Sequence, residues 1–297
     1  MRFETQEIID ASTWNKLLEN TEGIRAPGEW VFRAIGELKC ADPQTEVVDI
    51  SVESSFDKAW GRRTKEGGER RLYESWIISD FKREALNYLV NIPERDDFLE
   101  WMALGRHYGM PSRLVDFTYS FFVAAYFALS LRGKEEDGCI VALNLDLLKQ
   151  KWESKRESEY SDLTGARESF HSKELFHAFA FKPPANNFAA IVNPLRRNPR
   201  LANQRGCFLC PGNIAVSADE NLRETVGNEP ACKRLIRLRK ELKFDVMNAL
   251  WDMNISQATL YPDLIGWAES RRDLVHRDIS DERFRKELEI AINEPRI

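Results

Sequence analysis

The spacing of apolar residues divides the chain into short buried strands and amphipathic helices. Apolar runs or alternation predict strands at 29–34, 113–118, 138–143, 206–210 and 234–238. Apolar residues at helical spacing predict helices at 14–18, 73–90, 98–104, 121–131, 240–252 and 264–270. These elements do not alternate strictly as βαβ units. The pattern therefore predicts an α+β fold, with a modest mixed or antiparallel sheet and flanking helices.

Two helices carry specific packing expectations. The segment 121–131 is almost entirely apolar and contains small alanines, so we expect it to be buried closely against a sheet. In 73–90 the apolar residues share one helical face that we expect to point inward: Trp76, Ile77, Phe81, Ala85, Tyr88 and Leu89. The charged, glycine-bearing stretch 61–71 predicts a solvated loop.

The same pattern suggests three segments. Residues 1–28 form an N-terminal helix and turn, 29–270 form the main domain, and 271–297 form a charged, helical C-terminal tail. The apolar content of 43% is sufficient for a core and excludes a wholly disordered chain. Because 43 Lys and Arg oppose 48 Asp and Glu, the chain is not a generally basic nucleic-acid coat.

Location and metal content follow from a few further features. The chain has no apolar run of membrane-spanning length and no signal-peptide pattern, so we expect no membrane association. Five cysteines, an odd and sparse set, favour a reducing, cytoplasmic location. Cys207 and Cys210 have C-x-x-C spacing but lack a second ligand pair. We therefore interpret them as thiols on a strand and expect no metal site.

Polar residues inside apolar segments are the candidates for chemistry. Arg33 ends an apolar strand, and His107, Arg113, Asp116 and Thr118 lie together on a turn and strand before the buried helix. Burying such groups costs free energy unless they pair with each other or hold a ligand. An arginine fork suits a pyrophosphate. The alternative is structural: these residues lock the turn, Asp116 or Thr118 caps the next helix, and His107 bonds to backbone.

A local basic patch is predicted despite the negative net charge. Its members are Arg196, Arg197, Arg200 and Arg205. Such a cluster can hold the phosphates of RNA or DNA, or the acidic tail of a partner. The alternative is a solvated, ion-paired surface.

Several motifs together resemble the FRG-domain family. They are WVFRAIG from residue 30, RHYGMPSRLVDFTYSFFVAAYFALS from residue 106, RLANQRGCF from residue 200 and LYPDL from residue 260. The resemblance extends over roughly residues 29–270. The chain departs from the family at Ala34, where the family has glycine, and at Arg106, where it has glutamine.

The family's layout is similar, at fold level, to that of ADP-ribosyltransferases, which implies an enzyme that consumes NAD. The implied catalytic residues are Arg33, His107, Asp116 and Gln204, and the implied NAD-binding residues are Arg33, Tyr108, Arg113, Thr118 and Tyr126. Gln204 occupies the place of an acidic residue, so Asp116 is the alternative carboxylate.

The expected function is that of a toxin or phage-defence effector. It would modify RNA, DNA or protein and be held in check by a neutralising antitoxin. The alternative is a non-catalytic module that binds a nucleotide or nucleic acid.

Overall fold

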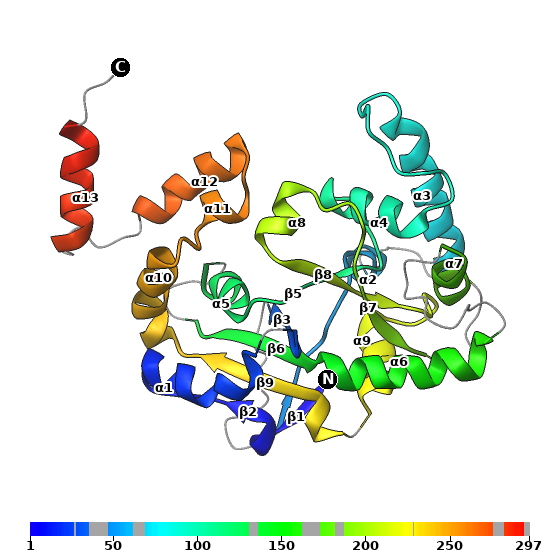
Figure 1. Cartoon of the computed structure of the whole chain (residues 1–297), viewed down its shortest axis with the longest axis horizontal. Coiled ribbons are helices and arrows are strands. Elements are labelled where there is room, and N and C mark those ends of the chain that lie inside the picture. Colours follow the sequence, from blue (N-terminus) through cyan, green and yellow to red (C-terminus); the bar gives the residue numbers. More distant parts are fainter. Residues whose placement is uncertain are drawn as a thin grey trace.

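The computed structural model describes residues 1–26, 28–35, 47–61, 69–130, 136–161, 173–181, 187–227, 229–275 and 282–293. A seven-stranded mixed sheet lies at its centre (Figure 1). Its strands, in spatial order, are β2 (Ile8–Ile9), β9 (Lys233–Leu238), β6 (Gly138–Asn144), β3 (Trp30–Ile35), β5 (Val115–Thr118), β8 (Gly206–Pro211) and β7 (Ala189–Val192). Among the strand pairs of the described residues, only β2–β9 is parallel. The predicted α+β class is confirmed.

Helices flank the sheet on both faces. The described α-helices of the chain are α1 (Trp14–Asn20), α2 (Ser55–Gly61), α3 (Arg70–Ala85), α4 (Phe98–His107), α5 (Phe121–Ser130), α6 (Leu145–Glu159), α7 (Lys173–Phe181), α8 (Pro199–Asn203), α9 (Ala218–Val226), α10 (Lys243–Asp252), α11 (Gln257–Leu260), α12 (Leu264–Val275) and α13 (Glu282–Asn293). No described helix is long and apolar enough to cross a membrane.

One face of the sheet is covered by two separate helical groups. Helices α1, α5 and α10 pack on the β3, β6 and β9 side, where Phe32, Ile140 and Ile236 point toward them. Helices α4 and α7 pack on the β8 and β7 side, where Phe208 and Ala190 point toward them. The opposite face is covered by α6 and α9. Strand β5 therefore runs between the two helical groups.

The N-terminal segment is more closely integrated than a helix and turn. Thr13 caps α1 through its side chain, as helix-capping chemistry favours. The residues before it also form strands, because β1 (Arg2–Glu4) pairs with β4 (Val47–Asp49) and β2 pairs with β9. These partners lie far along the chain, and short strands of this kind carry little local signal.

The predicted inward face of 73–90 is only partly correct. Ala85 is buried as expected, but Trp76 is 60% exposed and Tyr88 is 81% exposed. Glu74 and Ile78, which were not on the predicted face, are buried instead. The helix is rotated so that Glu74 reaches a buried arginine, Arg113. The buried ion pair between Glu74 and Arg113 thus decides which face of α3 points inward, and the spacing of apolar residues along the helix does not reveal it.

The cysteine prediction is confirmed for β8. Cys207 and Cys210 are both buried, free thiols. They are three residues apart on a strand and join different apolar clusters. Burial raises the pKa of both thiols, that of Cys210 to about 12. The loop predicted at 61–71 lies mostly outside the described residues.

Candidate functional site

A pocket of about 650 Å³ lies beside β5, between α4 and the segment 196–204. Strand β5 supplies Asp116, and its neighbour in the β8 ladder, Phe208, also lines the pocket. The other lining residues are Asn91, Pro93, Glu100, Ala103, Leu104, Arg106, His107, Gly109, Arg196, Arg197, Asn198, Pro199, Arg200, Leu201 and Gln204. Helices α4 and α8 carry most of them.

One face of α4 forms a wall of the pocket. Glu100, Ala103, Leu104 and His107 all line it, and they follow the i, i+3, i+4, i+7 spacing of a single helical face. Asp97 caps the helix by accepting from the Glu100 amide. The start of α4 is thereby fixed, and Glu100 and His107 are presented to the same space.

Asp116 meets the pocket as a member of an ion pair. The Asp116 Oδ2 atom lies 2.5 Å from Arg106 Nη2. The Asp116 side chain is half exposed. In the sequence Arg106 is only a departure from a family pattern, whereas in the structure it is the partner that neutralises the candidate acid.

Three arginines on and before α8 provide positive charge. Asn198 caps this helix through its side chain and Pro199 occupies its first turn. Arg196 donates from Nη1 to the Ile92 carbonyl at 2.6 Å, and Arg200 lies 4.4 Å from the centre of the Tyr261 ring.

None of these three arginines, Arg196, Arg197 and Arg200, forms an ion pair with a described residue. These three line the pocket, and Arg196 and Arg197 are also exposed, whereas Arg205 is exposed outside the pocket.

His107 lies near the end of this wall with its ring 5.0 Å from that of Tyr108. Burial lowers the pKa of the His107 imidazole, the charge of Arg200 lowers it further, and Asp263 opposes both. A lowered pKa favours the neutral imidazole at physiological pH, which is the form able to accept a proton.

Gln204 connects three elements. Its side-chain Nε2 donates to the Leu260 carbonyl at 3.1 Å, and its main-chain carbonyl accepts from Thr118 Oγ1 at 2.6 Å. Thr118 is almost fully buried and also accepts from the Ser120 amide. Ser120, rather than Asp116 or Thr118, accepts from the amide of Val123 at the start of α5. Thr118 is therefore a structural link behind the pocket and not a lining residue.

Arg33 lies behind Asp116 and is not one of the residues that line the pocket. Strands β3 and β5 share the single ladder pair Phe32–Thr118. Beyond it, Arg33 Nη1 donates to the Asp116 carbonyl at 2.6 Å and bridges the two strands. Burial lowers the pKa of the Arg33 guanidinium, with Asp116 opposing and Arg106 reinforcing the shift. The expected ligand clamp is thus a strand-to-strand contact in this structure.

Arg113 was expected to bind NAD, and in the structure its side chain is engaged inside the protein instead. Its side chain is fully buried and donates to Glu74 through both Nε and Nη2. Its Nη1 donates to the carbonyls of Ala180, Pro211 and Gly212. These donors are directed into the interior, so Arg113 locks the turn before β5, as the structural alternative predicted.

The two tyrosines expected to bind NAD, Tyr108 and Tyr126, differ in whether a ligand can reach them. Tyr126 is 2% exposed in the core, and its hydroxyl lies 3.3 Å from Gln257 Oε1. Tyr108 is exposed beside His107, although it is not one of the lining residues. Of the two tyrosines, only Tyr108 is placed where a ligand can reach it.

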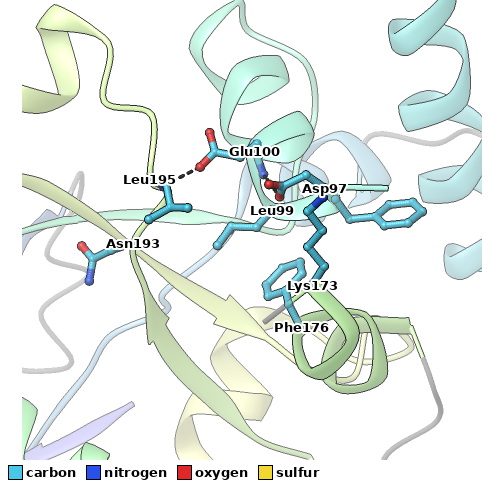
Figure 2. Close-up of a pocket in the computed structure, with 8 residues that line it drawn as sticks. Asp97, Leu99, Glu100, Lys173, Phe176, Asn193 and Leu195 are labelled. Atoms are coloured by element: carbon cyan, nitrogen blue, oxygen red, sulfur yellow. Dashed lines mark hydrogen bonds between the residues drawn. The ribbon is translucent and has the colours of Figure 1, made fainter. Parts of the chain in front are cut away.

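Glu100 is a site residue that the sequence analysis missed. Figure 2 shows its carboxylate reaching from α4 to Leu195, in a smaller hollow that Lys173 and Asn193 also line. The distance from Glu100 Oε1 to the Leu195 amide is 2.5 Å. The sequence carries only part of this signal, because the predicted helix 98–104 includes Glu100 but ends before His107, which was predicted to lie on the following turn.

Comparison with known proteins assigns part of this region. A family model for the FRG domain matches residues 46–137, which include α4 and β5 but not α8. No curated protein and no solved structure matches the chain. Among the described residues, no cluster of His, Cys, Asp and Glu is suited to hold a metal ion.

Proposed function

The chain carries an FRG domain over residues 46–137, and we propose that the pocket at its edge binds NAD and transfers the ADP-ribosyl group to an acceptor. The pocket is built partly by this domain, through α4 and β5, and partly by the later segment 196–208. Its volume of about 650 Å³ lies in the range that holds a small-molecule ligand or cofactor.

One observation carries the proposal. Arg196, Arg197 and Arg200 line one pocket without an ion-pair partner among the described residues. Arginines retain their charge, and their planar guanidinium groups match phosphate oxygens in pairs. The same pocket is lined by His107, whose lowered pKa favours the neutral imidazole, and by the carboxylates of Glu100 and Asp116. A pyrophosphate-bearing nucleotide satisfies this excess of positive charge.

The proposed reaction uses these groups as follows. The bond between ribose C1′ and the nicotinamide nitrogen breaks, and its electron pair leaves with neutral nicotinamide. An oxygen or nitrogen of the acceptor attacks C1′ and loses its proton, for which His107 is the candidate base. Carboxylates in the pocket would stabilise the positive charge that develops on the ribose.

The order of elements supports the same proposal by analogy. An arginine on β3, the β5 strand running into the alanine-rich α5, and the late strand β8 follow the ADP-ribosyltransferase-like order described from the sequence. Arg33 and Gln204 hold strands and helices together here, so the proposed ligand contacts come from α4 and α8 instead.

The acceptor that the surface favours is a nucleic acid. Arg197 at the pocket and Arg205 outside it are both exposed. Together they extend the positive charge beyond the pocket, where the phosphates of RNA or DNA can be held. Protein modification is the competing outcome.

The test combines binding and turnover. Calorimetry measures NAD binding to the wild type, to Arg197→Ala and to Arg205→Ala, which removes an exposed arginine outside the pocket. We expect Arg197→Ala to weaken NAD binding about tenfold and Arg205→Ala to leave it unchanged. Labelled NAD is then incubated with cellular RNA, DNA and protein, and nicotinamide release is measured. Absence of both NAD binding and label transfer excludes the proposal.

A non-catalytic nucleotide-binding module is the second candidate. It is favoured by the neutral, structurally engaged Gln204 and by the ion pair that neutralises Asp116. In that case NAD or a related nucleotide binds, Arg197→Ala weakens it, and no nicotinamide is ever released.

A further inference from the structure

Glu100 is fixed at the boundary between α4 and the arginine segment. Glu100 is only 6% exposed, yet it lines the large pocket. Its Oε1 accepts from the amides of Leu195 and Arg196 at 2.5 Å and 3.1 Å. The other carboxylate oxygen points away from Leu195 (Figure 2). Glu100 therefore positions the backbone that carries Arg196 while keeping one oxygen outside that contact.

The charge of Glu100 is not neutralised in the way that the charge of Asp116 is. Asp116 is paired with Arg106, whereas Glu100 forms no ion pair within the described part of the chain. No described residue donates to its Oε2. Burial raises the pKa of the Glu100 carboxyl and the charge of Asp97 reinforces the shift, while the two backbone amides and the charge of Arg196 oppose it. A carboxylate held in this way gains most from a ligand that brings a positive charge.

The pocket thus presents two opposite requirements. Arg196, Arg197 and Arg200 favour an anionic group, and Glu100 favours a cationic one. A free phosphate or pyrophosphate is attracted by the three arginines but repelled by the Glu100 carboxylate. A ligand that carries both an anionic and a cationic group is attracted by the arginines and by Glu100.

We propose that the pocket selects a zwitterionic nucleotide, with Glu100 recognising the cationic end while the three arginines on and before α8 hold the phosphates. This inference rests on the proposed function, whose reaction requires the oxidised form of NAD, and it assigns Glu100 as the residue that recognises the positively charged nicotinamide ring of that form. Reduced NAD has the same phosphates and nearly the same shape but a neutral ring. Comparing the two forms therefore isolates the contribution of the carboxylate.

The experiment measures binding of oxidised NAD, reduced NAD and ADP-ribose by calorimetry at neutral pH. The key variant is Glu100→Gln, because an amide oxygen can still accept from both backbone amides while the negative charge is removed. Glu220→Gln makes the same change on the exposed side of α9, away from the pocket, and serves as the matched control.

We expect the wild type and Glu220→Gln to bind oxidised NAD about tenfold more tightly than reduced NAD. In Glu100→Gln this preference should disappear, while ADP-ribose binds at least as tightly as before. Equal binding of the two NAD forms by the wild type overturns the inference, and this comparison needs no variant. A preference that survives in Glu100→Gln overturns it as well.

Failure of the proposed function looks different. If the wild type binds none of the three nucleotides, both proposals fall. If it binds all three equally, the nucleotide site stands and only the role of Glu100 is lost.

Discussion

Arg113 donates from Nε to Glu74 Oε1 across 2.7 Å in the interior and so ties α3 to the start of β5. Removing one member of a buried ion pair leaves the other charge without compensation. We expect Arg113→Met to lower the free energy of unfolding by about 3–5 kcal/mol, measured by denaturant titration.

The control for this prediction is Arg205→Met. Arg205 is exposed, so its replacement should change the free energy of unfolding by no more than about 0.5 kcal/mol. A loss below about 1 kcal/mol for Arg113→Met would show that the buried pair does not tie α3 to the sheet.

His107 predicts a pH dependence of stability. Its pKa is lowered in the folded state from the ordinary value of 6.5, chiefly by burial, so the unfolded chain takes up this proton first. The stability that the neutral imidazole provides is present above pH 6.5 and is lost as the pH falls through the folded-state pKa.

The measurement is the urea midpoint of the wild type and of His107→Gln at a series of pH values from neutral to acidic. The difference between the two curves isolates this histidine from the other titrating groups. The wild type should lose more stability on acidification than the variant. Parallel curves would mean that the imidazole pKa is not lowered.

Removing the charge of Asp116, which is paired with Arg106, should strengthen ADP-ribose binding but slow nicotinamide release. Asp116→Asn removes the charge that neutralises Arg106, so the pocket becomes more positive. We expect ADP-ribose to bind about two- to fivefold more tightly, as befits a half-exposed pair. If Asp116 also faces the ribose, nicotinamide release falls about 10²- to 10³-fold in the same variant.

Asp80→Asn is the control for this pair, because Asp80 forms an ion pair with Arg83 on α3 outside the pocket. It should leave ADP-ribose binding unchanged. Weaker ADP-ribose binding by Asp116→Asn would contradict the assignment of Arg106 as a neutralised cation.

Gly266 supports the back of the site. A Cβ atom at this position would overlap the carbonyl oxygen and Cβ of Tyr261, the residue stacked against Arg200. Backbone atoms cannot give way cheaply, so Gly266→Ala should lower the melting temperature by several degrees and weaken NAD binding together. Gly23→Ala is the control, since nothing lies within 4 Å of a Cβ there. Equal behaviour of the two variants would exclude this support.

Much of the local structure was predictable from the sequence. The strands that became β3, β5, β6, β8 and β9 and the helices that became α4, α5 and α10 were predicted close to their observed bounds. Apolar spacing reports which side of an element is buried, and that information is local. The predicted helix 98–104 ends before His107, so the face of α4 that Glu100 and His107 share is seen only in the structure.

The roles of the charged residues depended on distant partners. Arg113 and Glu74 meet only in the folded chain, and Arg33 meets Asp116 because β3 and β5 are neighbours in the sheet. Local spacing cannot reveal such partners, so both arginines were predicted as ligand contacts. Conversely, Arg196, Arg197 and Arg200 were predicted as a surface patch, and the fold brings them to α4.

The sequence by itself determined the α+β class, the main strands and helices, and which segments carry the polar candidates, because apolar periodicity is a local property. Only the tertiary structure decided which of those charges are neutralised and which face a common pocket. The physical reason is that the cost of burying a charge is settled by partners from remote segments, and pairing within the sheet and between helices selects those partners.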